Sequence, residues 1–448
     1  MKISFSKGVL LFLSVIYIYV GFNISVWNRK NIFQYDTLIY YEYLPAIFIY
    51  NDAKFEFVKD GDFPFVWLVE GPNDSYIPKT TMGVSIMYMP FFLIAHAYAV
   101  LTSGDTSGWS LPYQIMIYWS GMIYVLLGAI FLRKFLLRYF SDSVTGITLL
   151  LLCFGSNLFY YATSEPTMSH AYSFFLFCTL LQTFSSWLER NRMGTSILLG
   201  LVAGLIILVR PSNGLMVLPL VIVFMLQHKE NLIAALKERW GGLALASLAG
   251  FAVLLLQMVY WKYVTGSWLA YSYGEERFYF DRPHLTEGLF GYRKGWLLYT
   301  PIMVFALVGI ALLSKELKHW RWATAAYIAL HVYVVYSWWC WWYGGSFGSR
   351  PLVETYALLA LPFAATIRFL FDKGRKKVVM SVAAFVLLAC LGLNFIQTLQ
   401  YRKGLIHFDS MNKRAYWKVF CSFPDRVTML PYFTPETDYD RAMLGEEE

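Results

Sequence analysis

The feature that most constrains this chain is a series of apolar runs, each long enough to cross a lipid bilayer. The first run, at residues 8–26, reads GVLLFLSVIYIYVGFNISV, and similar runs recur along the sequence. A helix needs about 20 apolar residues to cross the hydrocarbon core, where only helices and closed barrels satisfy the backbone. Because 58% of the residues are hydrophobic and only 15% are charged, a soluble domain is excluded. The sequence predicts an all-α, polytopic bundle of membrane-spanning helices.

The runs and the basic loops between them predict a topology. About 11 crossings are expected, at residues 8–26, 111–132, 144–163, 167–187, 194–210, 212–227, 240–260, 296–313, 322–340, 351–371 and 378–397. Lysines and arginines gather in alternate loops, such as Arg133 with Lys134 and the cluster at 373–377. Basic loops stay cytoplasmic, so the N-terminus is predicted inside and the C-terminal tail outside. The net charge of +8 is read as this orientation signal and not as nucleic-acid binding.

Two apolar runs do not fit this alternation. Counting residues 82–101 as a crossing would invert every later helix, so we expect this run to lie along the outer interface or to be re-entrant. Residues 37–50 are too short to span and are expected at the same interface. Whether 82–101 crosses the membrane stays open.

The topology predicts a membrane domain at 1–397 and an outward tail at 398–448. Two long outward loops, 27–110 and 261–295, belong to the membrane domain. No small-residue cleavage site follows the first apolar run, so we expect an uncleaved helix. The five cysteines are scattered without a CxxC pair, which indicates neither a zinc site nor a disulfide framework.

Ionisable residues inside or beside membrane helices are costly and usually functional. Here Asp36, Lys79, Glu165, Arg210 and Arg350 are all expected at one depth, at outward helix ends or in outward loops. The sequence therefore predicts a polar site at the outer face.

Asp36 opens an amphipathic stretch in the segment FQYDTLIYY, just beyond the first crossing. A carboxylate at the lipid–water boundary can act as a general base or orient an acceptor. The alternative is an N-cap, a position that aspartate favours. The two roles are compatible.

Glu165 and His170 lie in the segment SEPTMSHAY. They could bind a substrate hydroxyl, or hold a metal ion together with Asp36. The structural alternative is a helix that starts with Pro166 at its first position.

Arg210 lies in ILVRPSNGL, between two short apolar runs. About 15 residues span roughly 22 Å, which is short of the ~30 Å hydrocarbon core, so the apex of this hairpin should lie below the outer surface. An arginine there needs an anion, and a lipid-linked phosphate would supply it. An intramolecular ion pair or snorkelling to the head groups is the alternative.

Three further cations are candidates for substrate binding. Lys79 and Arg350 lie in turn-rich outward sequence, and the glycines of GGSFGSR allow close approach of a ligand. Arg293 could grip a phosphate or anchor the chain at the interface. Ordinary loop residues are the alternative for Lys79 and Arg350.

These segments together resemble a known family. Asp36 after the first crossing, IPKTTMGVSIMYMPFF, SEPTMSHAYSFF, LVRPSNGL and GGSFGSRPLVE are similar to segments of the C-type (GT-C) polytopic glycosyltransferases. The resemblance covers most of residues 1–400. It is strongest to bacterial relatives of protein O-mannosyltransferases and lipid A aminoarabinose transferases.

The resemblance implies a GT-C fold, a polyprenyl-phosphate-linked hexose or pentose as donor, and inversion at the anomeric carbon. Asp36 takes the place of the family's catalytic loop aspartate, and Glu165 resembles the acidic residue of the second outward loop. Lys79 resembles a lysine that opens the second interfacial helix in some members. The paired acidic motif of oligosaccharyltransferases is absent, so no cofactor is expected and a required divalent metal is disfavoured.

The acceptor stays open among a glycan, a lipid and a protein. The resemblance places the protein in the cell inner membrane, among lipids, with its site on the extracytoplasmic face. One rival function is a transporter or flippase of a lipid-linked saccharide, although transporters favour paired repeats with broken helices. A second rival function is that of a non-catalytic membrane scaffold or a polymer ligase.

Overall fold

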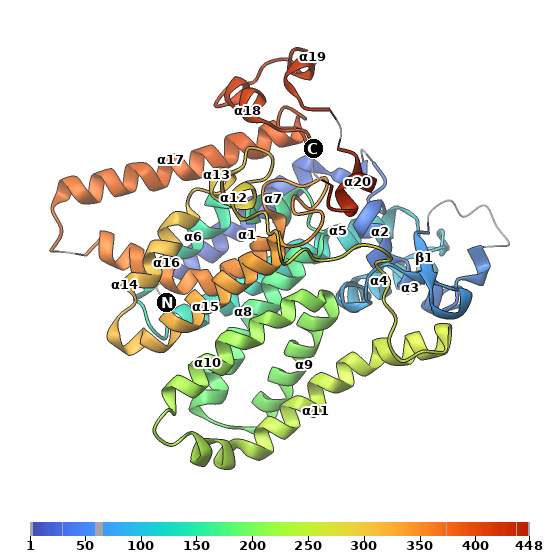
Figure 1. Cartoon of the computed structure of the whole chain (residues 1–448), viewed down its shortest axis with the longest axis horizontal. Coiled ribbons are helices and arrows are strands. Elements are labelled where there is room, and N and C mark those ends of the chain that lie inside the picture. The colour runs from blue at the N-terminus through green and yellow to red at the C-terminus, as the bar shows by residue number, and fades with distance from the viewer. Residues whose placement is uncertain (1–2, 29, 59–65, 373, 436, 447–448) are drawn as a thin grey trace.

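The computed structural model describes residues 3–28, 30–58, 66–372, 374–435 and 437–446, and these are mostly helical (Figure 1). Strands β1 (Leu68–Gly71) and β2 (Ser75–Pro78) form an antiparallel hairpin in which Leu68 pairs with Pro78. The longer helices are α1 (Phe5–Ile24), α4 (Gly83–Leu101), α5 (Leu111–Leu136), α6 (Asp142–Gly155), α8 (Ser169–Glu189), α9 (Met193–Val209), α10 (Val217–Gln227), α11 (Leu232–Thr265), α14 (Met303–Leu312), α15 (Lys318–Tyr336), α16 (Tyr356–Leu370) and α17 (Lys377–Arg402).

Short helices fill the loops between them. The short α-helices are α2 (Tyr35–Tyr41), α3 (Tyr43–Phe48), α7 (Leu158–Thr163), α12 (Leu285–Phe290), α13 (Trp296–Tyr299), α18 (Lys413–Val419), α19 (Arg426–Met429) and α20 (Tyr439–Met443). The 3₁₀ segments are η1 (Val26–Asn28), η2 (Glu56–Val58), η3 (Pro72–Asp74), η4 (Pro211–Met216), η5 (Lys315–Leu317), η6 (Arg350–Thr355) and η7 (Leu430–Tyr432).

Several helical segments have the dimensions of membrane spans. Within the described ranges, 6 are long and apolar enough to cross: Phe5–Asn28, Gly83–Leu101, Leu111–Leu136, Leu232–Thr265, Arg350–Leu370 and Lys377–Arg402. All of these except Gly83–Leu101 coincide with predicted crossings. The other predicted crossings coincide with helices that are shorter or more polar. The structure is therefore that of a polytopic helical protein, while the number of crossings and the interfacial placement of residues 82–101 stay predictions.

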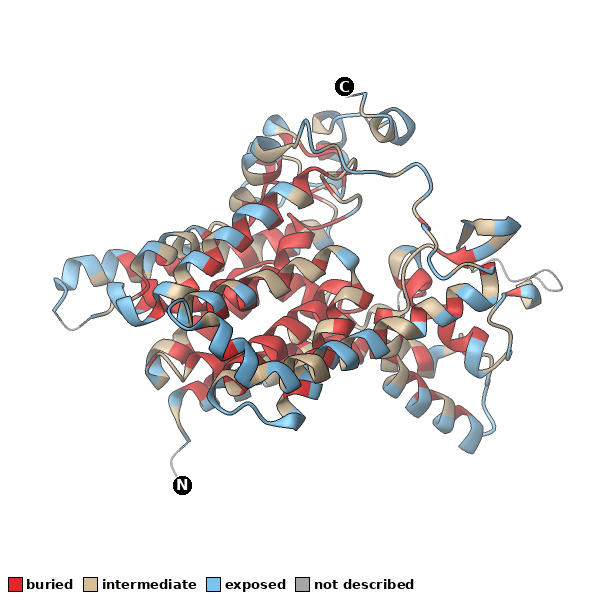
Figure 2. Cartoon of the chain, turned by 60° about the horizontal axis from the view of Figure 1, so that its bottom comes forward, coloured by how far each residue is buried: buried red, intermediate tan, exposed pale blue. Residues whose placement is uncertain are grey.

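The segment Arg350–Leu370, made of η6 and α16, forms the centre of the bundle. In its apolar window 89% of the residues are buried, against 22% in Lys377–Arg402 and 17% in Leu232–Thr265. It packs against α14, α6 and α8, and Figure 2 shows the buried residues concentrated in the middle of the helices. The central segment begins at Arg350, so that arginine stands at the start of a mostly buried helical segment.

The hairpin around Arg210 is broken where the sequence predicts it. Helix α9 ends at Val209, and η4 leads into α10 after Arg210. Helix α9 packs against α11 and α8, whereas α10 packs against α15. Thr81, just before α4, donates a hydrogen bond to the Leu208 carbonyl at 2.6 Å, which ties the end of α9 to the segment between β2 and α4. The depth of Arg210 in a bilayer stays a prediction.

The C-terminal tail lies over the 261–295 loop, near α12 and α13 (Figure 1). Arg293 donates to the Asp409 carboxylate at 2.9 Å, and Tyr279 donates to the Met443 carbonyl at 2.7 Å. The tail therefore contacts the 261–295 loop at two widely spaced points.

Candidate functional site

Asp36 lies in the first turn of α2 and is held by an arginine from the other end of the chain. The N-cap of α2 is Gln34, and it makes no side-chain capping bond, so the N-cap interpretation of Asp36 is wrong. The Asp36 Oδ2 instead accepts a hydrogen bond from Arg350 Nη1 at 2.9 Å. The Asp36 side chain is 35% exposed, so one face of the carboxylate stays open to solvent or substrate.

Tyr40 stands one helical turn after Asp36, on the same face of α2. Burial and the nearby Asp36 charge raise the pKa of the Tyr40 hydroxyl, while the positive charges of Arg210 and Arg350 oppose this rise. Helix α2 is also held by the turn before α8, because the Thr37 and Thr167 hydroxyls lie 2.9 Å apart in a buried contact. Tyr40 is therefore near enough to the acid and to both arginines to feel their charges.

The loop that carries Arg350 is fixed by α7. Gly348 has a φ of +61°, and a Cβ there would lie 3.2 Å from the Tyr299 Cβ, so a side chain would be strained and crowded. The Phe347 amide donates to the Tyr161 hydroxyl at 2.9 Å, and the Asn157 amide donates to the Phe347 carbonyl at 3.3 Å. The glycine-rich turn thus packs tightly against the bundle; close approach to a ligand stays a prediction.

Glu165 lies in the turn between α7 and α8. Helix α8 begins at Ser169, so the interpretation of Pro166 as the first helical residue is wrong. The turn is pressed against α5, where a Cβ on Gly121 would lie 1.7 Å from the Pro166 carbonyl oxygen. Burial raises the pKa of the Glu165 carboxyl above its usual range, against the opposing effects of a hydrogen bond from Tyr160 and of nearby positive charges. Glu165 is near enough to Asp36 and Arg350 to feel their charges.

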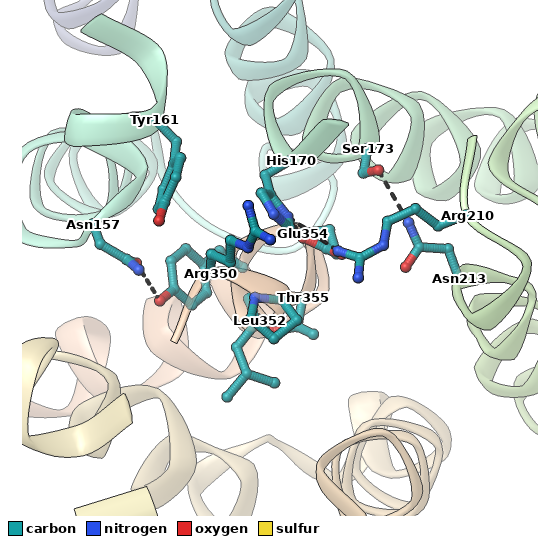
Figure 3. Close-up of polar contacts among 12 residues, drawn as sticks. Asn157, Tyr161, His170, Ser173, Arg210, Asn213, Arg350, Leu352, Glu354 and Thr355 are labelled. Carbon is teal, nitrogen blue, oxygen red and sulfur yellow. Dashed lines mark hydrogen bonds and ion pairs between the residues drawn. The ribbon is translucent and has the colours of Figure 1, made fainter. Parts of the chain in front are cut away.

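A second polar cluster lies beside this pair (Figure 3). His170 Nδ1 lies 2.9 Å from Glu354 Oε2, and Arg210 Nη1 lies 3.6 Å from Glu354 Oε1. The guanidinium of Arg210 also lies over the Tyr343 ring, 5.7 Å from its centroid. The intramolecular ion pair considered for Arg210 is therefore present, and His170 contacts this pair.

The sequence analysis missed Glu354 as the partner of both residues. It stands four positions after Arg350 within the quoted segment GGSFGSRPLVE and is only 1% exposed. A carboxylate at the start of a long apolar run is itself a signal of function. The sequence alone could therefore have singled out Glu354. Its partners, His170 and Arg210, could be identified only from the packed structure.

Lys79 and Arg293 contact other groups. The Lys79 ammonium forms an ion pair with Glu276, and the Trp339 indole donates to Glu276 Oε2 at 2.9 Å. The Arg293 guanidinium pairs with Asp409 and lies 3.8 Å from the centroid of a Trp342 ring. The structure thus brings together Asp36, Glu165 and Arg350, with Arg210 and His170 adjacent. Lys79 and Arg293 instead join loop and tail segments to one another.

Comparison with solved structures identifies the fold. No family model and no curated protein sequence matches the chain. The apo crystal structure of the oligosaccharyltransferase from Archaeoglobus fulgidus aligns with a TM-score of 0.52 and 15% identity, over 98% of this chain and 63% of that one. Its complex with Zn and sulfate aligns with a TM-score of 0.50 and 16% identity, over 98% and 57%.

The chain therefore shares its fold with an archaeal oligosaccharyltransferase. This chain spans less than two thirds of that protein's length. The resemblance to bacterial relatives of O-mannosyltransferases and aminoarabinose transferases stays a prediction.

The residues of the site give no complete set of metal ligands. Among the described residues, no three His, Cys, Asp or Glu side chains gather as metal ligands would. Asp36 is engaged by a guanidinium, and His170 is engaged by Glu354. The described residues therefore do not bring Asp36, Glu165 and His170 together as a set of metal ligands.

Proposed function

We propose that this protein is an inverting membrane glycosyltransferase, which moves a sugar from a polyprenyl-phosphate donor to an acceptor hydroxyl. The observation that carries the proposal is the 2.9 Å contact between Asp36 and Arg350, beside a second arginine, Arg210. A base next to two cations is what transfer from a phosphate leaving group requires. The shared fold with an oligosaccharyltransferase supports the same reaction class.

The chemistry follows from the groups present. Asp36 accepts the proton of the acceptor hydroxyl as that oxygen bonds to the anomeric carbon. The bond from this carbon to the phosphate oxygen breaks, and the electron pair leaves with the polyprenyl phosphate. Arg350 and Arg210 stabilise the charge that grows on the phosphate. Phosphate leaves readily, so one carboxylate suffices, and Glu165 is assigned to orienting the acceptor.

Two further cations are proposed to bind substrate at the edge of the site. Lys79 and Arg293 are proposed to contact substrate when the loops that hold them move. The active site is proposed on the extracytoplasmic face of the cell inner membrane, within a membrane domain at 1–397 that precedes an outward tail. The basic loops support this orientation.

The test is transfer by the purified protein from a labelled polyprenyl-phosphate sugar to membrane extracts. Asp36→Asn is expected to abolish transfer, with unchanged expression and thermal unfolding. Asp105→Asn is the matched control, because Asp105 is an exposed acid of the same outward loop. Normal turnover by Asp36→Asn would remove Asp36 as the base.

Transport of an intact lipid-linked saccharide is the alternative from a different functional class. It predicts movement of unmodified donor across a vesicle membrane. Covalent transfer of the label, without such movement, separates the enzyme from the transporter.

A further inference from the structure

A pocket of about 290 Å³ opens at the end of the bundle that lies away from Asp36. Its walls come from α14, α16 and the turn that follows α16, and they include Leu312, Arg368, Asp372 and Arg375. Figure 1 shows these elements on the left of the view, whereas α2, which carries Asp36, lies on the right. The pocket therefore belongs to a different part of the molecule from the proposed active site.

The central segment Arg350–Leu370 sets the separation between the two places. Arg350 stands at its start and contacts Asp36, whereas Arg368 stands near its end. About 18 positions at a rise of ~1.5–2 Å per residue give roughly 27–36 Å, which is close to the ~30 Å thickness of the hydrocarbon core. Because Asp36 is proposed at one lipid–water boundary, the pocket lies near the other.

Both arginines of the pocket are held by aromatic rings. The Arg375 guanidinium lies 3.7 Å from the centroid of the Phe369 ring, and its Nε donates to the Phe369 carbonyl at 3.2 Å. The Arg368 guanidinium lies 5.3 Å from the centroid of the Phe140 ring. A stacked guanidinium keeps its in-plane donors available. Among the described residues, no hydrogen bond uses the terminal nitrogens of Arg375 or any side-chain nitrogen of Arg368, so these donors are left for a ligand.

The charge around the pocket is positive, although two acids are present. Asp372 lines the pocket, and Glu316 is near enough to feel the charge of Arg368. In the sequence, residues 313–321 and 368–377 together carry eight lysines and arginines against these two acids. An excess of positive charge in a hollow attracts anions.

An exposed apolar row leads away from the pocket along α14. Val304, Val308 and Leu312 recur every four residues and so lie on one face of this helix. Val304 and Val308 are 43% and 52% exposed, and Leu312 lines the pocket. A free phosphate ion makes no use of such a row, whereas the acyl chain of a phospholipid would cover it. The cations and the row together therefore favour a lipid.

We propose that this pocket binds the phosphate of an anionic phospholipid, with Arg368 and Arg375 on the phosphate and an acyl chain along Val308 and Val304. Basic pockets between membrane helices bind such head groups. The lipid braces the end of the most buried long apolar segment from the leaflet opposite the proposed active site. This site goes beyond the proposed function and takes no part in the transfer of sugar.

Lipid binding to the purified full-length protein tests the pocket. The protein is titrated with phosphatidylglycerol, with phosphatidylcholine of the same chains and with inorganic phosphate, and bound molecules are counted by native mass spectrometry. Arg375→Gln removes one cation, and the double variant with Arg368→Gln removes both. Arg192→Gln is the matched control, because Arg192 is an exposed arginine of a different basic loop.

A second pair of variants tests the acyl chain. Val308→Ser interrupts the apolar row on α14. Val259→Ser is its matched control, because Val259 on α11 is a valine with the same exposed fraction, 52%.

We expect Arg375→Gln to weaken phosphatidylglycerol binding about fivefold, the effect of ~1 kcal/mol, and the double variant to weaken it further. Val308→Ser should weaken the binding of both lipids about twofold relative to Val259→Ser. Phosphatidylcholine should bind less tightly than phosphatidylglycerol and be insensitive to Arg375→Gln. Arg192→Gln should bind like the wild type.

Two results would overturn the proposal. Equal binding of phosphatidylglycerol by the wild type and the double arginine variant would show that the pocket is not the site. Displacement of phosphatidylglycerol by inorganic phosphate, with no effect of Val308→Ser, would assign the pocket to a free anion.

Thermal unfolding gives a second measurement on the same proteins. Phosphatidylglycerol should raise the unfolding temperature of the wild type and of Arg192→Gln more than that of the double variant, because a ligand of the folded state stabilises it. Equal rises would again overturn the pocket. Without lipid the variants should unfold like the wild type, since Arg368, Arg375 and Val308 are exposed. Both measurements are made without donor, so they do not depend on the glycosyltransferase assignment.

Discussion

The Arg350 guanidinium donates a hydrogen bond to the Asp36 carboxylate across 2.9 Å, and the two residues are 314 positions apart in the sequence. Asp36 belongs to the loop that follows α1, and Arg350 begins the most buried of the six long apolar segments among the described residues. The contact therefore fixes a loop acid to the rigid centre of the bundle.

Loss of this contact should impair catalysis more than folding. Arg350→Gln is expected to lower the transfer rate by about 100-fold, because it removes both the orientation of Asp36 and a charge near the leaving phosphate. Arg350→Lys should recover little, since an ammonium lacks the planar fork of a guanidinium. Arg368→Gln, near the other end of α16, is the control. A full rate with Arg350→Lys would show that charge alone suffices.

The Arg210–Glu354 pair should be a stability element. Glu354→Gln leaves Arg210 without its buried counter-charge and is expected to cost about 3 kcal/mol of unfolding free energy. Combining it with Arg210→Gln should recover part of that loss, because the two residues are in contact. Unfolding in denaturant of the two single variants and the double variant gives the coupling energy. Strict additivity would argue against the ion pair.

Glu165 should make stability depend on pH. Burial raises its folded-state pKa above the usual 4.5, so the stability it contributes is complete below that pH and is lost as the pH rises through the folded pKa. Wild type and Glu165→Gln should therefore unfold at similar temperatures when the pH is below the usual glutamate pKa of 4.5. At neutral pH the glutamine variant should be the more stable. Thermal unfolding at several pH values measures this, and the opposite trend would indicate a lowered pKa.

Lys294 should give a second pH dependence with the opposite sign. It is 2% exposed, donates to the Ser346 and Phe408 carbonyls, and so joins the Arg350 loop to the tail. Burial lowers the pKa of Lys294 from 10.5 to about 7. The folded state then binds fewer protons than the unfolded state across this interval, so stability should fall as the pH drops from 10.5 towards 7.

The variant Lys294→Met should flatten that slope. The measurement is the thermal unfolding temperature at several pH values in the alkaline range. Lys403→Met, an exposed lysine of the adjoining segment, should keep the wild-type slope. An unchanged slope in Lys294→Met would assign the dependence to another group.

The sequence was informative where the free-energy cost of burying a polar group limits which residue types a segment can contain. The helical class and the break at Arg210 could be predicted because apolar runs and a charged residue between them leave few alternatives. The gathering of Asp36, Glu165 and Arg350 agrees with the prediction that these residues lie at one depth, at helix ends or in the loops between helices. The partners of Arg210 and Lys79 could not be predicted, since Glu354 and Glu276 approach them only through tertiary packing.

Local rules misled the sequence analysis at two positions. Asp36 favours an N-cap, yet the helix begins one residue before it, and its carboxylate is engaged by Arg350. Pro166 favours a first helical position, yet the turn continues to Ser169. In both cases a tertiary contact prevailed over a local preference.

The ion pair between Lys79 and Glu276 joins two loops that are 197 positions apart in the sequence. Any separation of these two loops has to break this pair first. Because dissolved ions weaken such pairs, the two loops should part more readily at high ionic strength.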